Sequence, residues 1–100
     1  MAAKTTRETH ENILQELQQE RVAALTRISR TLEALIDQMH AVRARIDVET
    51  GPTRAREVET YRALREEAVK YRWYLEVQRE AMGIRVHHRL DEFYEVPGPL

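Results

Sequence analysis

Hydrophobic residues recur in alternating steps of three and four along the first half of the chain. The series is Leu25, Ile28, Leu32, Leu35, Met39, Val42 and Ile46. This spacing places one apolar row on one side of an α-helix, as in the seam of a coiled coil. Thr5 and Glu8 precede the row at the spacing of a capping box, in which both side chains satisfy free backbone N–H groups. The pattern therefore predicts a long helix over residues 5–49.

A second row with the same spacing follows the first Gly and the first Pro of the chain. Gly51 suits the left-handed conformation that ends a helix, and Pro52 suits the first turn of the next helix. The second row reads Tyr61, Leu64, Ala68, Tyr71, Leu75, Gln78 and Met82. We therefore predict a turn at 50–52, a second helix over 52–83 and an all-α fold in which the two helices form an antiparallel, coiled-coil-like hairpin.

The remaining segment, 84–100, has no long repeat and is predicted to be a tail. It contains a potential short helix, which Pro97 and Pro99 prevent from continuing. The apolar residues of this short helix are Leu90, Phe93 and Tyr94. We expect them to hold the tail against a helix of the same chain or of a neighbour. Because a chain of 100 residues is long enough for only one domain, residues 1–100 are predicted to form a single helical-hairpin domain.

The second helix carries another apolar row on the side opposite its seam. This row consists of Val69, Trp73, Val77 and Ala81, and Ile84 continues it. A helix of an isolated hairpin needs only one apolar face, so this second face is expected to be covered by the tail, a second copy or a different protein. Trp is prominent among the residues that dominate binding energy at interfaces, which makes Trp73 the central candidate.

The two predicted helices differ in length, which leaves part of the first one without a neighbour. If the turn centres near residue 51, residues 5–17 extend beyond the end of the second helix. The apolar residues in this extension are Ile13, Leu14 and Leu17. We expect the tail or a partner chain to cover them, because two helices alone bury little surface.

The composition removes several classes of protein. The 16 Lys and Arg residues nearly balance the 17 Asp and Glu residues, so the chain has no overall attraction to nucleic acid or to an anionic membrane. The absence of Cys excludes disulfides and thiolate chemistry. No apolar run approaches the roughly 20 residues of a membrane-spanning helix, and the N-terminal residues lack the apolar core of a secretion signal. We therefore expect a cytoplasmic protein.

A metal site is one alternative that the sequence leaves open. Glu33, Asp37 and His40 share one face of the first helix. Helical bundles that resemble ferritin bind two irons through Glu residues and Glu-x-x-His pairs, which the Asp37-x-x-His40 pair matches only in part. All three residues point away from the seam, so we expect no bound metal or other cofactor.

Two further alternatives involve nucleic acid. Asp47 and Glu49 form an acidic hairpin tip that resembles, in architecture only, the secondary-channel factors of bacterial RNA polymerase, which place carboxylates near a catalytic Mg²⁺. The second helix is also rather basic, which would suit a phosphate backbone, although six Glu residues are interleaved. Its basic residues are Arg54, Arg56, Arg62, Arg65, Lys70 and Arg72.

The sequence contains no recognisable catalytic constellation. Its only Ser, Ser29, lies within the first helix, and its three Gly residues are isolated, so no phosphate-binding loop is present. The favoured interpretation is a non-catalytic protein–protein interaction module, such as an adaptor, an assembly factor or a small subunit, which binds a protein partner or itself as a homo-oligomer. The predicted interface comprises Val69, Trp73, Val77, Ile84, Leu90, Phe93 and Tyr94.

Overall fold

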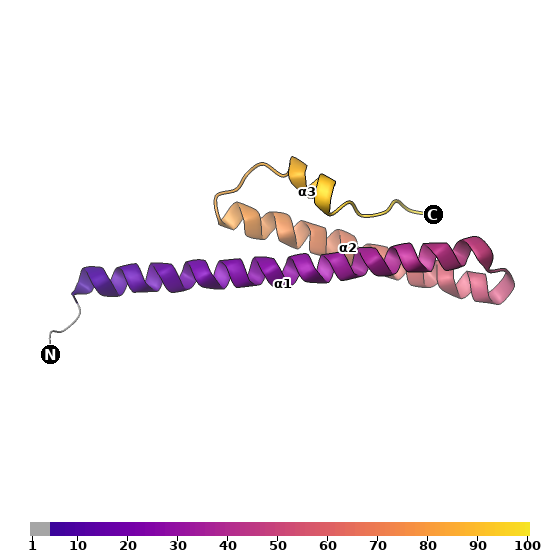
Figure 1. Ribbon diagram of the computed structural model, residues 1–100, viewed down its shortest axis with the longest axis horizontal. Helices are drawn as coiled ribbons and strands as arrows, with labels where there is room; N and C mark the ends of the chain where they lie inside the picture. The colour runs from indigo at the N-terminus through magenta and orange to yellow at the C-terminus, as the bar shows by residue number, and fades with distance from the viewer. Residues whose placement is uncertain (1–4) are drawn as a thin grey trace.

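The computed structural model describes residues 5–100, and these residues form an all-α helical hairpin with a short helical tail. The helices are α1 (Thr6–Val48), α2 (Gly51–Ala81) and α3 (His88–Phe93). α1 and α2 lie side by side and antiparallel, and α3 lies over α2 (Figure 1). The predicted fold class is confirmed. Residues 1–4, which the prediction included in the domain, lie outside the described residues.

Side-chain and backbone hydrogen bonds define the helix ends. The predicted capping box is present, because the Glu8 backbone N–H donates to Thr5 Oγ1 (3.1 Å) and the Thr5 N–H donates to Glu8 Oε2 (3.2 Å). At the end of α2 the N–H of Gly83 donates to the carbonyl of Glu80, and the N–H of Ile84 donates to that of Arg79. This is the Schellman pattern, and it requires the positive φ of 84° that Gly83 adopts.

The two predicted apolar rows meet and form the core. Leu32 and Ala68 are fully buried, and the cluster extends along the hairpin toward the turn. Its buried members are Leu32, Met39, Val42, Ile46, Tyr61, Ala68, Leu75 and Leu90. Gly51 does not end α1 as predicted, because α1 ends at Val48 with the extended Glu49 as its C-cap; Gly51, with a positive φ of 59°, is instead the first residue of α2.

The N-terminal part of α1 projects beyond the hairpin. Every residue of α1 from Thr6 to Ala23 is exposed, and burial begins at Ala24. We call residues 6–23 the overhang. It is longer than the extension of 5–17 predicted from the sequence, because α2 ends at Ala81 and because Gln18 and Arg21 put polar side chains in the row where the seam would continue.

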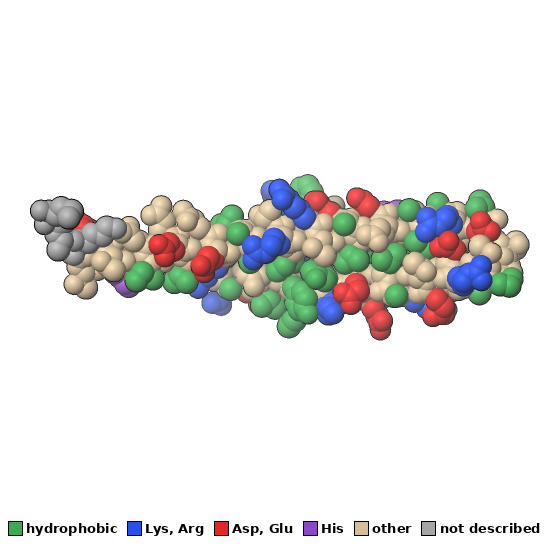
Figure 2. Space-filling model, turned by 90° about the horizontal axis from the view of Figure 1, so that it is seen from below, with side chains coloured by type: hydrophobic (Ala, Val, Ile, Leu, Met, Phe, Trp, Pro, Cys, Tyr) green, Lys and Arg blue, Asp and Glu red, His purple; other side chains and the backbone are tan. Residues whose placement is uncertain are grey.

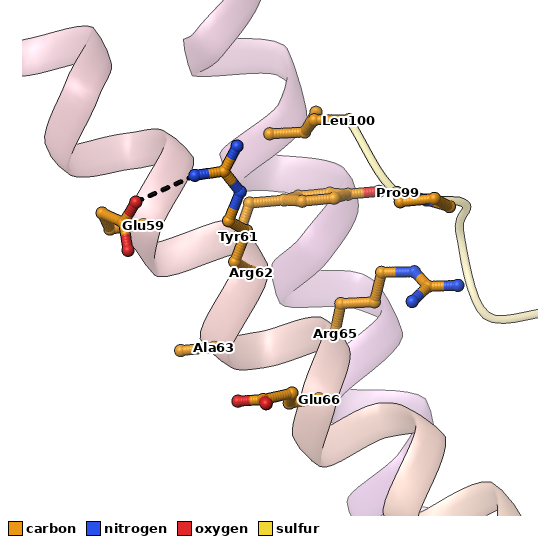
Figure 3. Close-up of a pocket in the computed structure, with 8 residues that line it drawn as sticks. All are labelled: Glu59, Tyr61, Arg62, Ala63, Arg65, Glu66, Pro99 and Leu100. Atoms are coloured by element: carbon orange, nitrogen blue, oxygen red, sulfur yellow. Dashed lines mark hydrogen bonds and ion pairs between the residues drawn. The ribbon is translucent and has the colours of Figure 1, made fainter.

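The tail folds back along α2 of its own chain. Leu90 is only 4% exposed and belongs to the core cluster, and Tyr94 and Val96 pack against the same cluster. Figure 3 shows Tyr61 and Arg65 reaching from α2 toward the end of the tail. The Tyr61 hydroxyl donates to the Gly98 carbonyl (2.6 Å), and Arg65 Nε donates to the Pro97 carbonyl (3.0 Å).

A second set of polar contacts fixes the connection between α2 and α3. Arg79 Nη2 donates to the Val86 carbonyl (2.9 Å), and Arg79 Nε donates to His87 Nδ1 (3.4 Å). On the other side of the ring, His87 Nε2 lies 3.1 Å from Glu80 Oε1, within hydrogen-bond distance. The tail is therefore held at both ends.

The position of Phe93 and the surfaces left uncovered correct the prediction for the tail. Phe93 is 70% exposed, so it does not help to dock the tail. Successive residues of a helix point about 100° apart, so α3 turns Leu90 and Tyr94 inward and Phe93 outward. The tail also covers neither Trp73 nor the overhang. It packs instead on the side of α2 where side chains can donate to its backbone carbonyls.

The hydrogen bond of Tyr61 provides a test of tail docking. Tyr61→Phe keeps the buried ring and removes the donor, so the free energy of unfolding is expected to fall by about 0.5–1.5 kcal/mol in denaturant titrations. Tyr74→Phe is the matched control, because the Tyr74 hydroxyl makes no hydrogen bond within residues 5–100, and a change below about 0.5 kcal/mol is expected. Equal losses in the two variants would show that the tail contact contributes nothing.

Candidate protein-interaction surface

An uncovered apolar row runs along the outer side of α2. Its large side chains are those of Val69, Trp73 and Val77, which Ile84 continues beyond the end of α2, and we call these four the Trp73 row; Ala81, also predicted in the row, is exposed as well. Trp73 is 58% exposed, and the other three side chains are each more than a third exposed. Figure 2 shows hydrophobic side chains gathered at the lower edge of the middle of the molecule. The row predicted from the sequence is thus open to solvent over residues 5–100, and the tail reaches only its first member, Val69, which lines a groove with Tyr94 and Val96.

Aromatic contacts connect Trp73 to the core. The ring of Trp73 lies 5.6 Å from that of Tyr74, and the ring of Tyr74 meets that of Tyr71 edge to face at 5.4 Å. Tyr71 itself packs against the buried cluster. Such aromatic pairs contribute about 0.5–1.5 kcal/mol beyond their buried area. Trp73 therefore projects from a supported position, and a partner would lose little side-chain entropy on binding it.

Charged side chains border the Trp73 row. Arg72 is bound by two carboxylates, with Nη1 2.7 Å from Glu76 and Nη2 2.9 Å from Asp91 of α3. Partial burial by itself would lower the pKa of Arg72, but the hydrogen bonds to Asp91 and Glu76 raise it above its usual value. The guanidinium therefore stays charged and also ties α3 to α2. An apolar centre with a polar rim is the usual composition of a protein interface.

The overhang carries a second uncovered apolar surface. Its members, each about half exposed, are Ile13, Leu14 and Leu17, whereas Val22, also about half exposed, lies on another side of the helix. In the view of Figure 2, hydrophobic side chains of the overhanging end lie along the same lower edge as the group at the middle of the molecule. No other part of residues 5–100 packs on the overhang.

Three of the seven predicted interface residues lie outside the Trp73 row. Leu90 is buried and Tyr94 is half-buried in contacts with their own chain, so neither is free for a partner in this conformation. Phe93 remains exposed on α3. The accessible apolar surface of α2 is therefore the Trp73 row alone.

An open pocket lies at the end of the tail. It has a volume of about 400 Å³, and Figure 3 shows its residues. They are Glu59, Tyr61, Arg62, Ala63, Arg65, Glu66, Pro99 and Leu100. Arg62 pairs with Glu59 (3.0 Å), while Tyr61 and Arg65 hold the tail. The sequence analysis placed Tyr61 only in the seam and did not predict its hydrogen bond to the tail. The one signal for this bond was the hydroxyl group that Tyr61 brings to a mostly aliphatic row.

The candidate metal ligands remain on the surface. Glu33, Asp37 and His40 are all exposed on α1, on the side away from α2. Over residues 5–100, no group of three or more His, Asp or Glu side chains is close enough to hold a metal ion. The hairpin itself thus supplies no further ligand to these three residues.

The hairpin tip is a mixture of acids and bases. Arg43 Nε lies 3.5 Å from Asp47 Oδ1. Arg45 donates hydrogen bonds from Nε and Nη2 to the two carboxylate oxygens of Glu57 on α2. Glu49 is half-buried at the end of α1. Of the two acidic residues at the tip, Asp47 thus has a guanidinium beside it, whereas the Glu49 carboxylate forms no ion pair within residues 5–100.

Most basic side chains of α2 are occupied within the chain. Those with partners on the same helix or on the segment after it are Arg56, Arg62, Arg65, Lys70, Arg72 and Arg79. Lys70, for example, lies 3.2 Å from Glu67. Over the described residues, α2 thus lacks a continuous row of free cations of the kind that tracks a phosphate backbone.

Comparison with known proteins finds no relative of this chain. The chain matches no model of a known protein family, and it shows no significant similarity to a curated protein or to a solved structure. Among residues 5–100, no helix combines the length and the apolar character needed to cross a membrane. The functional argument therefore depends on the geometry described above.

Proposed function

We propose that this protein is a non-catalytic protein–protein interaction module, an adaptor, assembly factor or small subunit, that binds its partner through the Trp73 row. The observation that carries the proposal is the exposure of Trp73, which is 58% accessible at the centre of an apolar row. The other side of α2 is already buried against α1 and the tail, so this row is not required for the hairpin to fold.

Physical arguments favour binding over an incidental surface. Single exposed apolar residues are common, whereas a row of four rimmed by charges is typical of an interaction site. Burial of the Trp73 side chain removes more apolar area from water than that of any other side chain on this face. The Tyr74 contact holds its ring in place before binding, which reduces the entropy lost on association.

Substitution of Trp73 tests the proposal. Immobilised protein with Trp73→Ala is expected to capture at least tenfold less of the partner from host-cell extract than the immobilised wild-type chain does. Quantitative mass spectrometry measures the two amounts. Removal of an aromatic residue at the centre of an interface costs about 2 kcal/mol or more. Trp73 contributes no contact to the buried cluster, so circular dichroism should show the same helix content.

Glu66→Ala is the matched control, because Glu66 is exposed on the outer side of the same helix. It is expected to capture the partner as the wild type does, since single charges at a rim contribute little. Capture of the same proteins in the same amounts by the Trp73→Ala chain would contradict the proposal.

A further inference from the structure

The side chains around the Trp73 row define the charge of the partner that it fits. We infer that the row binds a basic amphipathic helix of another protein, whose apolar side covers Trp73 and whose Lys or Arg residues meet the carboxylates around it. This inference rests on the proposed function, because it assigns a chemical class to the partner that binds the same surface.

Acidic side chains predominate among the helical neighbours of Trp73. Residues three, four and seven positions away from it share its side of α2. Their charged members are Glu66, Lys70, Glu76 and Glu80. Lys70 does not offset these carboxylates, because its ammonium group lies 3.2 Å from Glu67 Oε1 instead. The apolar row therefore lies in a negatively charged border.

Neither Glu66 nor Glu80 forms an ion pair with a Lys or Arg of residues 5–100. Figure 3 shows Glu66 pointing away from Arg65 and from the tail. Glu80 lies 3.1 Å from His87, which is charged only when it is protonated. Arg85 lines a small pocket with Glu80 but makes no ion pair with it. These two carboxylates are therefore available to the cations of a partner.

A groove continues the Trp73 row toward the tail. It is open to solvent, has a volume of about 420 Å³ and begins at Val69, the first member of the row. The other residues that line it are Arg72, Asp91, Tyr94, Glu95 and Val96. A helix that lies on the row can therefore place side chains from one of its edges in the groove.

The groove fits a long basic side chain. Its apolar lining can cover the methylene groups of Lys or Arg, which bury this part of the side chain and keep the charged end in a polar setting. The Arg72 guanidinium lies 2.7 Å from Glu76 and 2.9 Å from Asp91, so one positive charge is shared by two carboxylates. Glu95 makes no ion pair within residues 5–100. A cation from the partner would therefore gain carboxylate contacts here.

The spacing of the apolar residues favours a helix as the partner. Val69, Trp73 and Val77 are four residues apart and form a ridge on α2. Ridges of this kind interdigitate with those of a second helix in the commonest class of helix packing. Amphipathic helices bind to apolar surfaces in this way, through apolar residues three or four positions apart.

The balance of charge favours a basic partner over an acidic one. Five carboxylates surround the row and the groove, against the guanidinium groups of Arg72 and Arg85. They are those of Glu66, Glu76, Glu80, Asp91 and Glu95. A phosphate backbone or an anionic membrane would be repelled from this surface. The overhang of a second copy is also a poor fit, because it contains four Glu against two Arg.

A synthetic helix tests the inference on the pure protein. The probe is a peptide of about 18 residues, long enough to form a helix, with Leu on one side, Lys at both edges of that side and no Trp. Its binding should shift the emission of Trp73, the only Trp of the chain, to shorter wavelength. The same peptide with Glu in place of each Lys should bind about tenfold more weakly, because it brings like charges together.

Charge reversal locates the peptide on the surface. A chain with both Glu66→Lys and Glu95→Lys should bind the Lys peptide about tenfold more weakly and the Glu peptide more tightly than the wild type does. Damage to the fold would not produce this gain. Glu33→Lys with Asp37→Lys is the matched control, because it makes the same change in net charge at exposed positions of α1 and should leave both affinities unchanged. Glu66→Ala alone should have little effect, since it removes a single rim charge.

Four results would overturn the inference: equal binding of the Lys and Glu peptides, no binding of either, an equal effect of the control variant, or a dimer of the pure protein in which Trp73 is already protected. The proposed function is decided separately, by the capture experiment with Trp73→Ala. If neither peptide binds while Trp73→Ala still loses the captured protein, the proposed function holds and only the basic helix is wrong.

Discussion

Leu32→Ala is expected to lower the free energy of unfolding by about 2–5 kcal/mol, the range measured for Leu to Ala changes in protein cores. Leu32 is fully buried in the middle of the seam, where α1 has α2 beside it. Truncation to Ala removes apolar contacts and leaves a cavity that two long helices cannot easily close. A hairpin of this size has little stability in reserve, so thermal unfolding should shift by many degrees.

Glu33→Ala is the matched control for Leu32→Ala. Glu33 is adjacent in sequence, exposed, and outside the seam, and Ala is an equally good or better helix former. The free energy of unfolding should change by about 0.5 kcal/mol or less, measured at the same protein concentration. If both substitutions had the same effect, the seam would not be the core of the folded protein.

Deletion of residues 88–100 is expected to lower the free energy of unfolding by about 3 kcal/mol. The deletion removes the buried Leu90 side chain, which contributes about 1.5–3 kcal/mol, and the hydrogen bond from Tyr61, which contributes about 1 kcal/mol. It also exposes part of the core cluster next to Tyr61. The cut leaves Gly83 and Ile84 in place, so the end of α2 keeps its cap.

Two measurements separate tail docking from other effects of the deletion. The Trp73 emission spectrum should not change, because the tail does not cover Trp73. Phe93→Ala should leave the unfolding free energy within about 0.5 kcal/mol of the wild type, since Phe93 is 70% exposed. A truncated chain that melts like the intact one would mean that the tail is not bound to α2 in solution.

Periodicity was sufficient to predict the hairpin, because its core depends on one repeated spacing. Each seam position predicted on α1, from Leu25 to Ile46, packs in the cluster, and Gly83 ends α2 with the expected positive φ. The Trp73 row was predictable for the same reason. A helix that is apolar on two sides must keep one side free or find a partner for it.

The position of the tail could not be predicted in this way. Its docking depends on two backbone carbonyls, at Pro97 and Gly98, that meet the donors of Arg65 and Tyr61. Carbonyl positions depend on the path of an irregular segment, and hydrophobic spacing says nothing about that path. The sequence also could not show which of Phe93 and Tyr94 would face the core. They are adjacent aromatic residues at the end of a helix of only six residues, with Tyr94 as its C-cap.

The uninterrupted course of α1 implies a gradient of local stability along a single helix. From Ala24 onward its backbone hydrogen bonds are protected by packing against α2, whereas those of the overhang are exposed to water on all sides. The overhang extends a helix that is already nucleated, so each residue adds only a small increment of helix stability. Its far end is stabilised by the Thr5 cap and by the exposed ion pair of Arg7 with Glu11. Amide protons should therefore exchange fastest in the first turns of α1. A contact made by the overhang would be coupled to helix ordering and would extend the cooperative unit toward the first turn of α1.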